Sequence, residues 1–119
     1  IPHGGSLHID HQVTFRAAVT ATRPLPDSPV RKVYATEILS STEWAPATTS
    51  TPFRPNRFVD IAATLKRKMQ ALEYYRCEMR DPPHSRSVDS VRALARLRGT
   101  SVGIEAAEAF EVVREIDAA

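Results

Sequence analysis

Apolar residues recur at helical spacing in the first quarter of the chain. Val13, Ala17 and Ala21 follow one another at intervals of four, and two prolines come shortly after them. This interval puts side chains on one face of an α-helix, whereas proline cannot supply the amides that a helix interior needs. We therefore expect a helix at about 11–22, with Asp10 as the cap that accepts hydrogen bonds from the first turn.

Two further helical patterns lie in the second half of the chain. The more regular one is an apolar face made of Ile61, Leu65, Met69 and Leu72. It predicts a helix at about 61–77, with Asp60 as its cap. A second helix is expected to begin after Ser87, and Gly99 stands where a left-handed residue would end it.

The remaining segments lack a sustained helical period. Residues 31–38 are rich in β-branched and aromatic side chains and predict a buried or mostly buried strand. Residues 105–116 mix alanine and glutamate, which favour helix, with Phe and Val, which suit a strand, so the pattern leaves their type open. Residues 40–56 predict a long loop, which is either functional or dependent on contacts from another segment.

Composition places the chain among ordinary globular domains. It has 119 residues, of which 42% are hydrophobic and 25% charged, enough for one core. The formal charge of +2 is too small to indicate a nucleic-acid or membrane partner. No apolar run approaches the ~20 residues that cross a bilayer. Cys77 has no intrachain partner for a disulfide, which favours a cytoplasmic setting.

The candidate chemistry is concentrated where the first helix begins. His8, Asp10 and His11 lie within four consecutive residues, and imidazole nitrogen and carboxylate oxygen are suitable zinc ligands. A catalytic zinc usually takes three protein ligands, and residues this close in sequence seldom enclose a metal without a further ligand. On these residues alone, the alternative is a surface or capping feature that binds no metal.

Other residues admit two interpretations each. Glu37 follows the predicted strand and could contact a substrate, or could be an exposed loop carboxylate. Trp44 could stack on a sugar or cover the core. Tyr74 and Tyr75 are expected in the core and at its rim. Cys77 is expected to be an inert, buried or half-buried thiol.

The segment His3-Gly4-Gly5-Ser6-Leu7-His8-Ile9-Asp10-His11 resembles the second metal motif of the LmbE/PIG-L family of zinc-dependent N-deacetylases. The similarity continues in order along nearly the whole chain. It includes residues 23–26, 33–34, 37–44, 55–61, the helix that holds Lys68 and Leu72, residues 92–96 with Gly99, and 105–110 as a closing strand.

This resemblance implies an α/β fold, a partial Rossmann-like three-layer domain with zinc at the carboxyl ends of parallel strands. It implies that His11 is a zinc ligand, that Asp10 steadies the site through hydrogen bonds, and that His8 stabilises the tetrahedral intermediate or protonates the amine. The implied reaction is zinc-assisted removal of the N-acetyl group from an amino-sugar-type substrate, with a carboxylate as general base.

One departure from the family decides what to expect of the chain alone. The family's Ala-His-Pro-Asp-Asp-Glu-type motif, which supplies that base and two metal ligands, does not occur in the sequence, and Ser6 stands where such loops usually carry Asp. We therefore expect residues 1–119 to be a single incomplete domain, the C-terminal half of the family fold. It would be inactive alone and completed by homo-oligomerisation or by a missing N-terminal half. The alternative is a non-catalytic remnant that acts as an oligomeric binding or structural protein.

Overall fold

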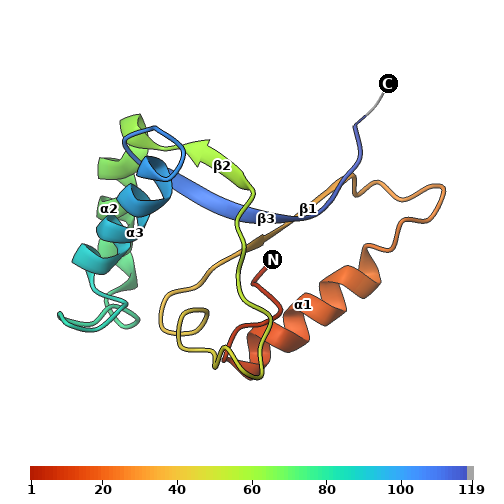
Figure 1. Cartoon of the computed structure of the whole chain (residues 1–119), viewed down its shortest axis with the longest axis horizontal. Helices are drawn as coiled ribbons and strands as arrows, with labels where there is room; N and C mark the ends of the chain where they lie inside the picture. Colours follow the sequence, from red (N-terminus) through yellow and green to blue (C-terminus); the bar gives the residue numbers. More distant parts are fainter. Residues whose placement is uncertain (118–119) are drawn as a thin grey trace. The chain divides into compact units, whose positions relative to one another are not determined.

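The computed structural model describes residues 1–117 as an α/β protein with a three-stranded antiparallel sheet (Figure 1). The elements in chain order are α1 (Ile9–Ala21), β1 (Lys32–Thr36), β2 (Arg57–Asp60), the 3-10 helix η1 (Ala62–Thr64), α2 (Leu65–Leu72), the 3-10 helix η2 (Glu73–Tyr75), α3 (Val88–Thr100) and β3 (Ala107–Glu115). The strand order is β1-β3-β2. The expected α/β class is thus confirmed.

The chain divides into two compact units. The first, here the sheet unit, contains Ile1–Arg57 and the chain from Phe110 onward. The second, here the helical unit, contains Phe58–Ala109. The boundaries fall inside β2 and β3, so these two strands contribute residues to both units.

In the sheet unit, β1 pairs with β3 from Lys32↔Glu115 to Thr36↔Phe110, with an irregularity between Val33 and Tyr34. The expected strand at 31–38 is confirmed. Its burial alternates, with Val33 buried and Lys32 exposed, because successive side chains of a strand point to opposite faces. One face of β1 therefore contributes to the core and the other does not.

The first residues of the chain lie along β1 in parallel. Pro2 forms a parallel bridge with Thr36. The Ile1 ammonium donates to the Tyr34 carbonyl at 2.9 Å, Thr36 N–H donates to the Ile1 carbonyl at 2.9 Å, and His3 N–H donates to the Thr36 carbonyl at 3.0 Å. Parallel neighbours need a long crossover connection, and α1 lies within it. Residues 1–3 thus pair in parallel with β1, and α1 lies in the connection between them.

Helix α1 begins earlier than the sequence suggests. Its N-cap is His8, whose Nδ1 accepts a hydrogen bond from Asp10 N–H at 3.3 Å. The prediction of Asp10 as the cap was wrong, because Asp10 already lies in the first helical turn. A carboxylate in that turn still suits the positive end of the helix dipole.

In the helical unit, the single helix expected at 61–77 is wrong in its extent. Regular α-helix covers only Leu65–Leu72, and one 3-10 helix lies on each side of it. The predicted cap Asp60 does accept a hydrogen bond through Oδ1, from Ala62 N–H at 2.9 Å, and so holds the first of these turns.

The end of this helical stretch faces solvent. Tyr74 is 90% exposed and Tyr75 is 62% exposed, so their expected places in the core and at its rim were wrong. Cys77 is also exposed, which overturns its expected burial. These residues lie in or after the 3-10 helix η2, beyond the last apolar residue of the α2 face.

Helix α3 begins as the sequence predicts, because Ser87 is its N-cap and its Oγ accepts a hydrogen bond from Ser90 N–H at 3.1 Å. Gly99 was wrongly predicted as the left-handed residue after the helix. It is buried within α3, and a Cβ there would come within 2.6 Å of Ala106 Cα and N. The residue with a left-handed conformation is Gly103, at φ +79°.

The core of the helical unit is a small cluster of Ile61, Ala95 and Ala106, with Leu65 packed against it. The chain then continues from Ala106 into β3, whose type the sequence pattern left open. Two of its alanines, Ala107 and Ala109, are buried. They lie on the same face of the strand, where their small side chains pack in the interior. The helix-favouring alanines thus belong to a buried strand and not to a helix. No helix within residues 1–117 has the length and apolar character needed to cross a membrane.

Candidate functional site

The histidine loop, residues 3–8, leads from the parallel pairing with β1 into α1. Ser6 in this loop is 1% exposed, and its Oγ lies 2.9 Å from His11 Nδ1. The loop is held beneath the helix because Gln12 Nε2 donates to the Ser6 carbonyl at 2.8 Å. A His11 ring that donates from Nδ1 carries its lone pair on Nε2, which is the form able to bind a metal.

His8 lies directly beside His11. The ring centroids are 4.9 Å apart and the planes meet at 29°, which is a stacked arrangement. Asp10 Oδ2 lies 3.8 Å from His8 Nδ1. The structure therefore brings the three predicted site residues together, with Asp10 beside His8. The His8 and Asp10 side chains are 49% and 81% exposed, so the cluster opens to solvent.

The donor set supplied by the described residues suits part of a zinc site. His11 and His8 offer imidazole nitrogens, the donor type that zinc prefers with thiolate and carboxylate. Within residues 1–117, no group of three or more His, Cys, Asp or Glu side chains converges as a metal site would require. A catalytic zinc takes three protein ligands. Donors from outside this part of the chain would be needed to complete the set.

His3 anchors the start of the loop from inside the sheet unit. It is 5% exposed, its Nδ1 lies 2.8 Å from Glu111 Oε2, and its Nε2 lies 2.8 Å from the Thr51 carbonyl oxygen. Both ring nitrogens thus face oxygen atoms, one on the Glu111 carboxylate and one on the Thr51 carbonyl. Sequence reasoning missed this role, because partners so far apart in sequence leave no local pattern.

Gly4 and Gly5 are required by close packing. A Cβ on Gly5 would come within 2.2 Å of the Thr51 carbonyl oxygen, and one on Gly4 would come within 2.7 Å of the Phe15 ring. The first contact is with backbone, which a rotamer change cannot relieve. The glycine pair therefore lets the loop lie against the 50–54 segment and α1.

Of the two candidate substrate residues, Glu37 directly follows β1, and Trp44 lies in the loop expected at 40–56. The start of this loop is bonded to the histidine loop, because Leu7 N–H donates to the Ser41 carbonyl at 2.9 Å. Glu37 is partly buried and Trp44 is 50% exposed. Ser40 has φ +66°, and its N–H donates to Glu43 Oε1 at 2.6 Å. Both candidates thus lie close in sequence to Ser41, which is fixed to the histidine loop.

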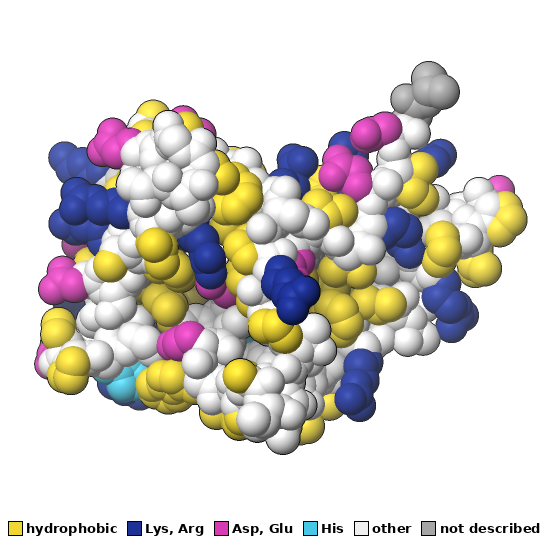
Figure 2. Space-filling model, in the orientation of Figure 1, with side chains coloured by type: hydrophobic (Ala, Val, Ile, Leu, Met, Phe, Trp, Pro, Cys, Tyr) yellow, Lys and Arg dark blue, Asp and Glu magenta, His cyan; other side chains and the backbone are white. Residues whose placement is uncertain are grey.

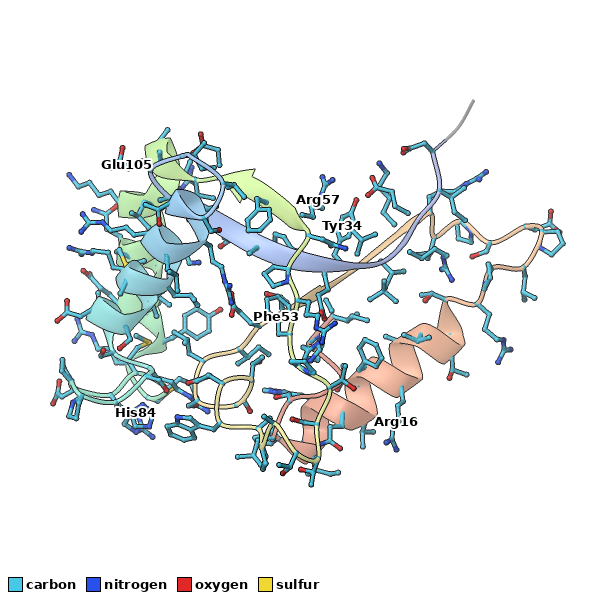
Figure 3. All side chains as sticks on the ribbon, viewed as in Figure 1. Arg16, Tyr34, Phe53, Arg57, His84 and Glu105 are labelled. Carbon is cyan, nitrogen blue, oxygen red and sulfur yellow. The ribbon has the colours of Figure 1, made fainter. Side chains whose placement is uncertain are left out.

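A charged cluster lies on β1 and β3 away from the histidines. The hydrogen bond from Lys32 to Glu115, at 2.6 Å, raises the pKa of Lys32 and lowers that of Glu115. The Arg57 guanidinium lies 4.6 Å from the centre of the Tyr34 ring, and Figure 3 labels both side chains. Loss of hydration raises the Tyr34 pKa. These contacts join β1, β3 and the start of β2, and the Glu115 carboxylate is paired with cations there.

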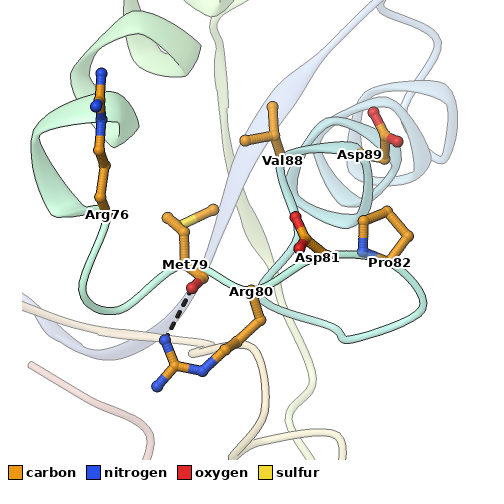
Figure 4. A pocket seen from close by; sticks show the side chains of 7 residues that line it. All are labelled: Arg76, Met79, Arg80, Asp81, Pro82, Val88 and Asp89. Carbon is orange, nitrogen blue, oxygen red and sulfur yellow. Dashed lines mark hydrogen bonds between the residues drawn. The ribbon is translucent and has the colours of Figure 1, made fainter.

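The helical unit has a pocket of about 470 Å³ beside the start of α3 (Figure 4). Arg76, Arg80, Asp81 and Asp89 are its charged residues, so positive and negative groups balance. Arg80 Nη1 donates to the Cys77 and Met79 carbonyls at 2.7 and 2.8 Å. This balance gives the pocket no preference for an ion of either sign.

Comparison of the chain with protein-family models, with curated proteins and with solved structures finds no match in any of the three.

Proposed function

We propose that the chain is the C-terminal portion of a zinc-dependent amidohydrolase that removes N-acetyl groups from amino-sugar-type substrates. The observation that carries the proposal is the 2.9 Å contact between Ser6 Oγ and His11 Nδ1. A histidine that binds a metal almost always donates its other ring N–H to a nearby acceptor, which fixes the tautomer. Ser6 can do this where a carboxylate would otherwise stand.

In this proposal His11 binds zinc through Nε2. His8, stacked on His11 and open to solvent, donates a hydrogen bond to the developing oxyanion or a proton to the leaving amine. The Asp10 carboxylate lies beside this ring, 3.8 Å from His8 Nδ1, and contributes to the polarity of the site. When bound, zinc would polarise the amide carbonyl and lower the pKa of water. The other donors and the general base would come from a segment outside residues 1–119.

The pairing of residues 1–3 with β1 supports a Rossmann-like arrangement for the complete domain. Both segments run in the same direction, so their carboxyl ends lie at one edge. The histidine loop follows one of these ends, and Glu37 follows the other. Ligands of open α/β sheets bind outside such carboxyl ends. Glu37 and Trp44 are therefore the proposed substrate contacts of this site.

Exposed apolar side chains support a covering segment or a second copy of the chain. Leu7, Ile9 and Val13 are 50%, 64% and 57% exposed where the histidine loop meets α1. Such a group of large apolar side chains is typical of an interaction surface. If a second copy covers it, the chain is a homo-oligomer, and a non-catalytic binding or structural role becomes the second candidate.

Zinc titration against a chromophoric chelator tests the proposal. We expect weak zinc binding by the chain alone. Binding should tighten when a separate segment with an Ala-His-Pro-Asp-Asp-Glu-type motif is added, and the mixture should release acetate from N-acetylglucosamine. His11→Ala should abolish the tightening, and Ser6→Ala should weaken it about 10-fold, since partners of ligating histidines contribute 10- to 100-fold to affinity.

His84→Asn is the matched control, because His84 lies in the helical unit. It should leave zinc binding unchanged. Two results would contradict the proposal: zinc affinity that is the same in His11→Ala as in the original chain, or deacetylation by the chain without any added segment. Light scattering at micromolar concentration tests the second candidate, which requires a dimer or larger assembly. That assembly should bind zinc no more tightly when the separate segment is added.

A further inference from the structure

The sheet unit contains a pocket of about 540 Å³ that the proposed deacetylase site does not use. It is enclosed by residues from four segments: the histidine loop, α1, residues 51–56 and β3. A pocket of about 300–1,000 Å³ is the usual size for a small-molecule site. Its walls and charges together indicate which class of molecule it would take.

One side of the pocket is apolar. Phe15 from α1 and Val112 and Val113 from β3 line it, and Gly4 and Gly5 expose backbone there. Figure 2 shows apolar side chains gathered over α1 with Lys and Arg on either side of them. Binding of a compact hydrophobic group to this wall would remove apolar surface of both the group and the protein from water, which is favourable.

The guanidinium groups of the pocket have no hydrogen-bond or ion-pair partner among the described residues. Arg16, labelled on α1 in Figure 3, and Arg54 are both exposed. Neither guanidinium forms a hydrogen bond or an ion pair with any residue in 1–117; only the backbone N–H of Arg54 is bonded, to Glu111 Oε1. Guanidinium groups in this state are available to bind an oxyanion.

The acidic group of the pocket already has hydrogen-bond partners within the chain. Glu111 is the acidic residue among those that line it in the described chain. Its Oε2 contacts His3 Nδ1 at 2.8 Å, and its Oε1 accepts from the Arg54 N–H. Two arginines, Arg16 and Arg54, against this one glutamate leave the pocket with a net positive charge. Asn56 adds a donor, because its Oδ1 accepts from Val112 N–H at 2.8 Å and its side-chain amide keeps its own N–H groups.

We propose that this pocket binds a small organic anion, with a carboxylate or phosphate group between Arg16 and Arg54 and a compact apolar body against Phe15, Val112 and Val113. The two arginines select a ligand with a negatively charged head group, and the apolar wall selects one whose other end is hydrophobic. The site requires no metal and no segment outside the chain, so it does not depend on the deacetylase proposal.

The test is an NMR titration of the full chain with hexanoate, hexyl phosphate and hexanol. We expect either anion to shift the amide signals of Gly4, Gly5, Phe15 and Val112 at concentrations at least about 10-fold lower than hexanol, as fits charge-assisted hydrogen bonds. The tighter anion identifies the head group. Acetate, which has the charge without the apolar body, should bind more weakly than hexanoate.

Charge-removing variants locate the binding. Arg16→Gln and Arg54→Gln should each weaken anion binding about 10-fold, whereas Arg31→Gln, an exposed arginine outside the pocket, should not. All three side chains are exposed, so the amide spectrum should remain that of the folded chain. The proposal is overturned if hexanol binds as well as the anions, if acetate matches hexanoate, or if all three variants bind equally.

Discussion

Replacement of Gly99 by alanine should destabilise the protein, although helix propensity predicts the opposite. Gly99 lies inside α3 and is buried. In an ordinary helix interior, Gly→Ala stabilises by about 1 kcal/mol. Here a Cβ would meet Ala106 Cα and N at 2.6 Å and the Glu105 carbonyl carbon at 2.8 Å. All three atoms belong to the backbone, so no side-chain rotation can relieve the contact.

The magnitude follows from the size of the overlap. Carbon atoms pack best at about 3.5–4.0 Å, so α3 and the Ala106 segment would have to separate by about 1 Å. That shift opens the small cluster of Ile61, Ala95 and Ala106. Overpacking of this kind typically costs about 1–3 kcal/mol, and contact with backbone favours the upper end. After the propensity gain is subtracted, we expect a net loss of about 2 kcal/mol in the free energy of unfolding.

Thermal unfolding followed by circular dichroism measures this loss. For a chain of this size, about 2 kcal/mol corresponds to a fall in Tm on the order of 8 °C. Ala93→Gly is the matched control, because Ala93 is exposed in the same helix and reports the propensity term alone, about 1 kcal/mol. A Tm for Gly99→Ala that equals or exceeds that of the original chain would refute the argument from close packing.

Three further predictions concern single contacts. The hydrogen bond from Lys32 lowers the pKa of Glu115 below its ordinary value of 4.5. The ionised carboxylate therefore stabilises the folded state above about pH 4.5, and this stabilisation is lost as the pH falls through the lowered pKa of the folded state. Lys32→Met should therefore flatten the stability profile below about pH 5, measured by urea unfolding; an unchanged slope would count against the pairing. Ser87→Ala removes the cap that Ser90 N–H uses and should cost about 1 kcal/mol in chemical denaturation, whereas a cost near zero would exclude a capping role. Cys77 should react with a thiol reagent in the native protein at the rate of an exposed cysteine, and a need for denaturant would show that it is covered.

Local patterns in the sequence predicted the start of α3 and the position of β1, but not the start of α1 or the extent of α2. Ser87 was found because a cap bonds within its own turn, and the strand at 31–38 because its side chains are β-branched and aromatic. The role of Gly99 was predicted wrongly because a glycine is required there by tertiary contact with the Ala106 backbone, which no local sequence pattern reveals. The same limit applies to 73–77, where the apolar face ends and the chain changes to a 3-10 helix.

The candidate site divides in the same way. His8, Asp10 and His11 are neighbours in sequence, so their proximity could be predicted from the helix start. The contacts that support them could not. Ser6 was noted as a departure from the family pattern, yet its bond to His11 emerges only when the loop folds back beneath α1. The contacts of His3 with Glu111 and Thr51 likewise form only in the folded chain, because these residues are far from His3 in sequence.

Glu111 has a consequence for how the protein opens. One of its oxygens holds His3 and the other holds the Arg54 amide, so a single carboxylate fastens two stretches of irregular backbone to β3. The two stretches also contact each other directly, because His3 Nε2 lies 2.8 Å from the Thr51 carbonyl oxygen, so neither can detach without leaving the other short of a partner. Hydrogen exchange in the two should therefore proceed through a shared opening event with one free energy, and the region should behave as one cooperative subunit of the fold rather than as independent loops.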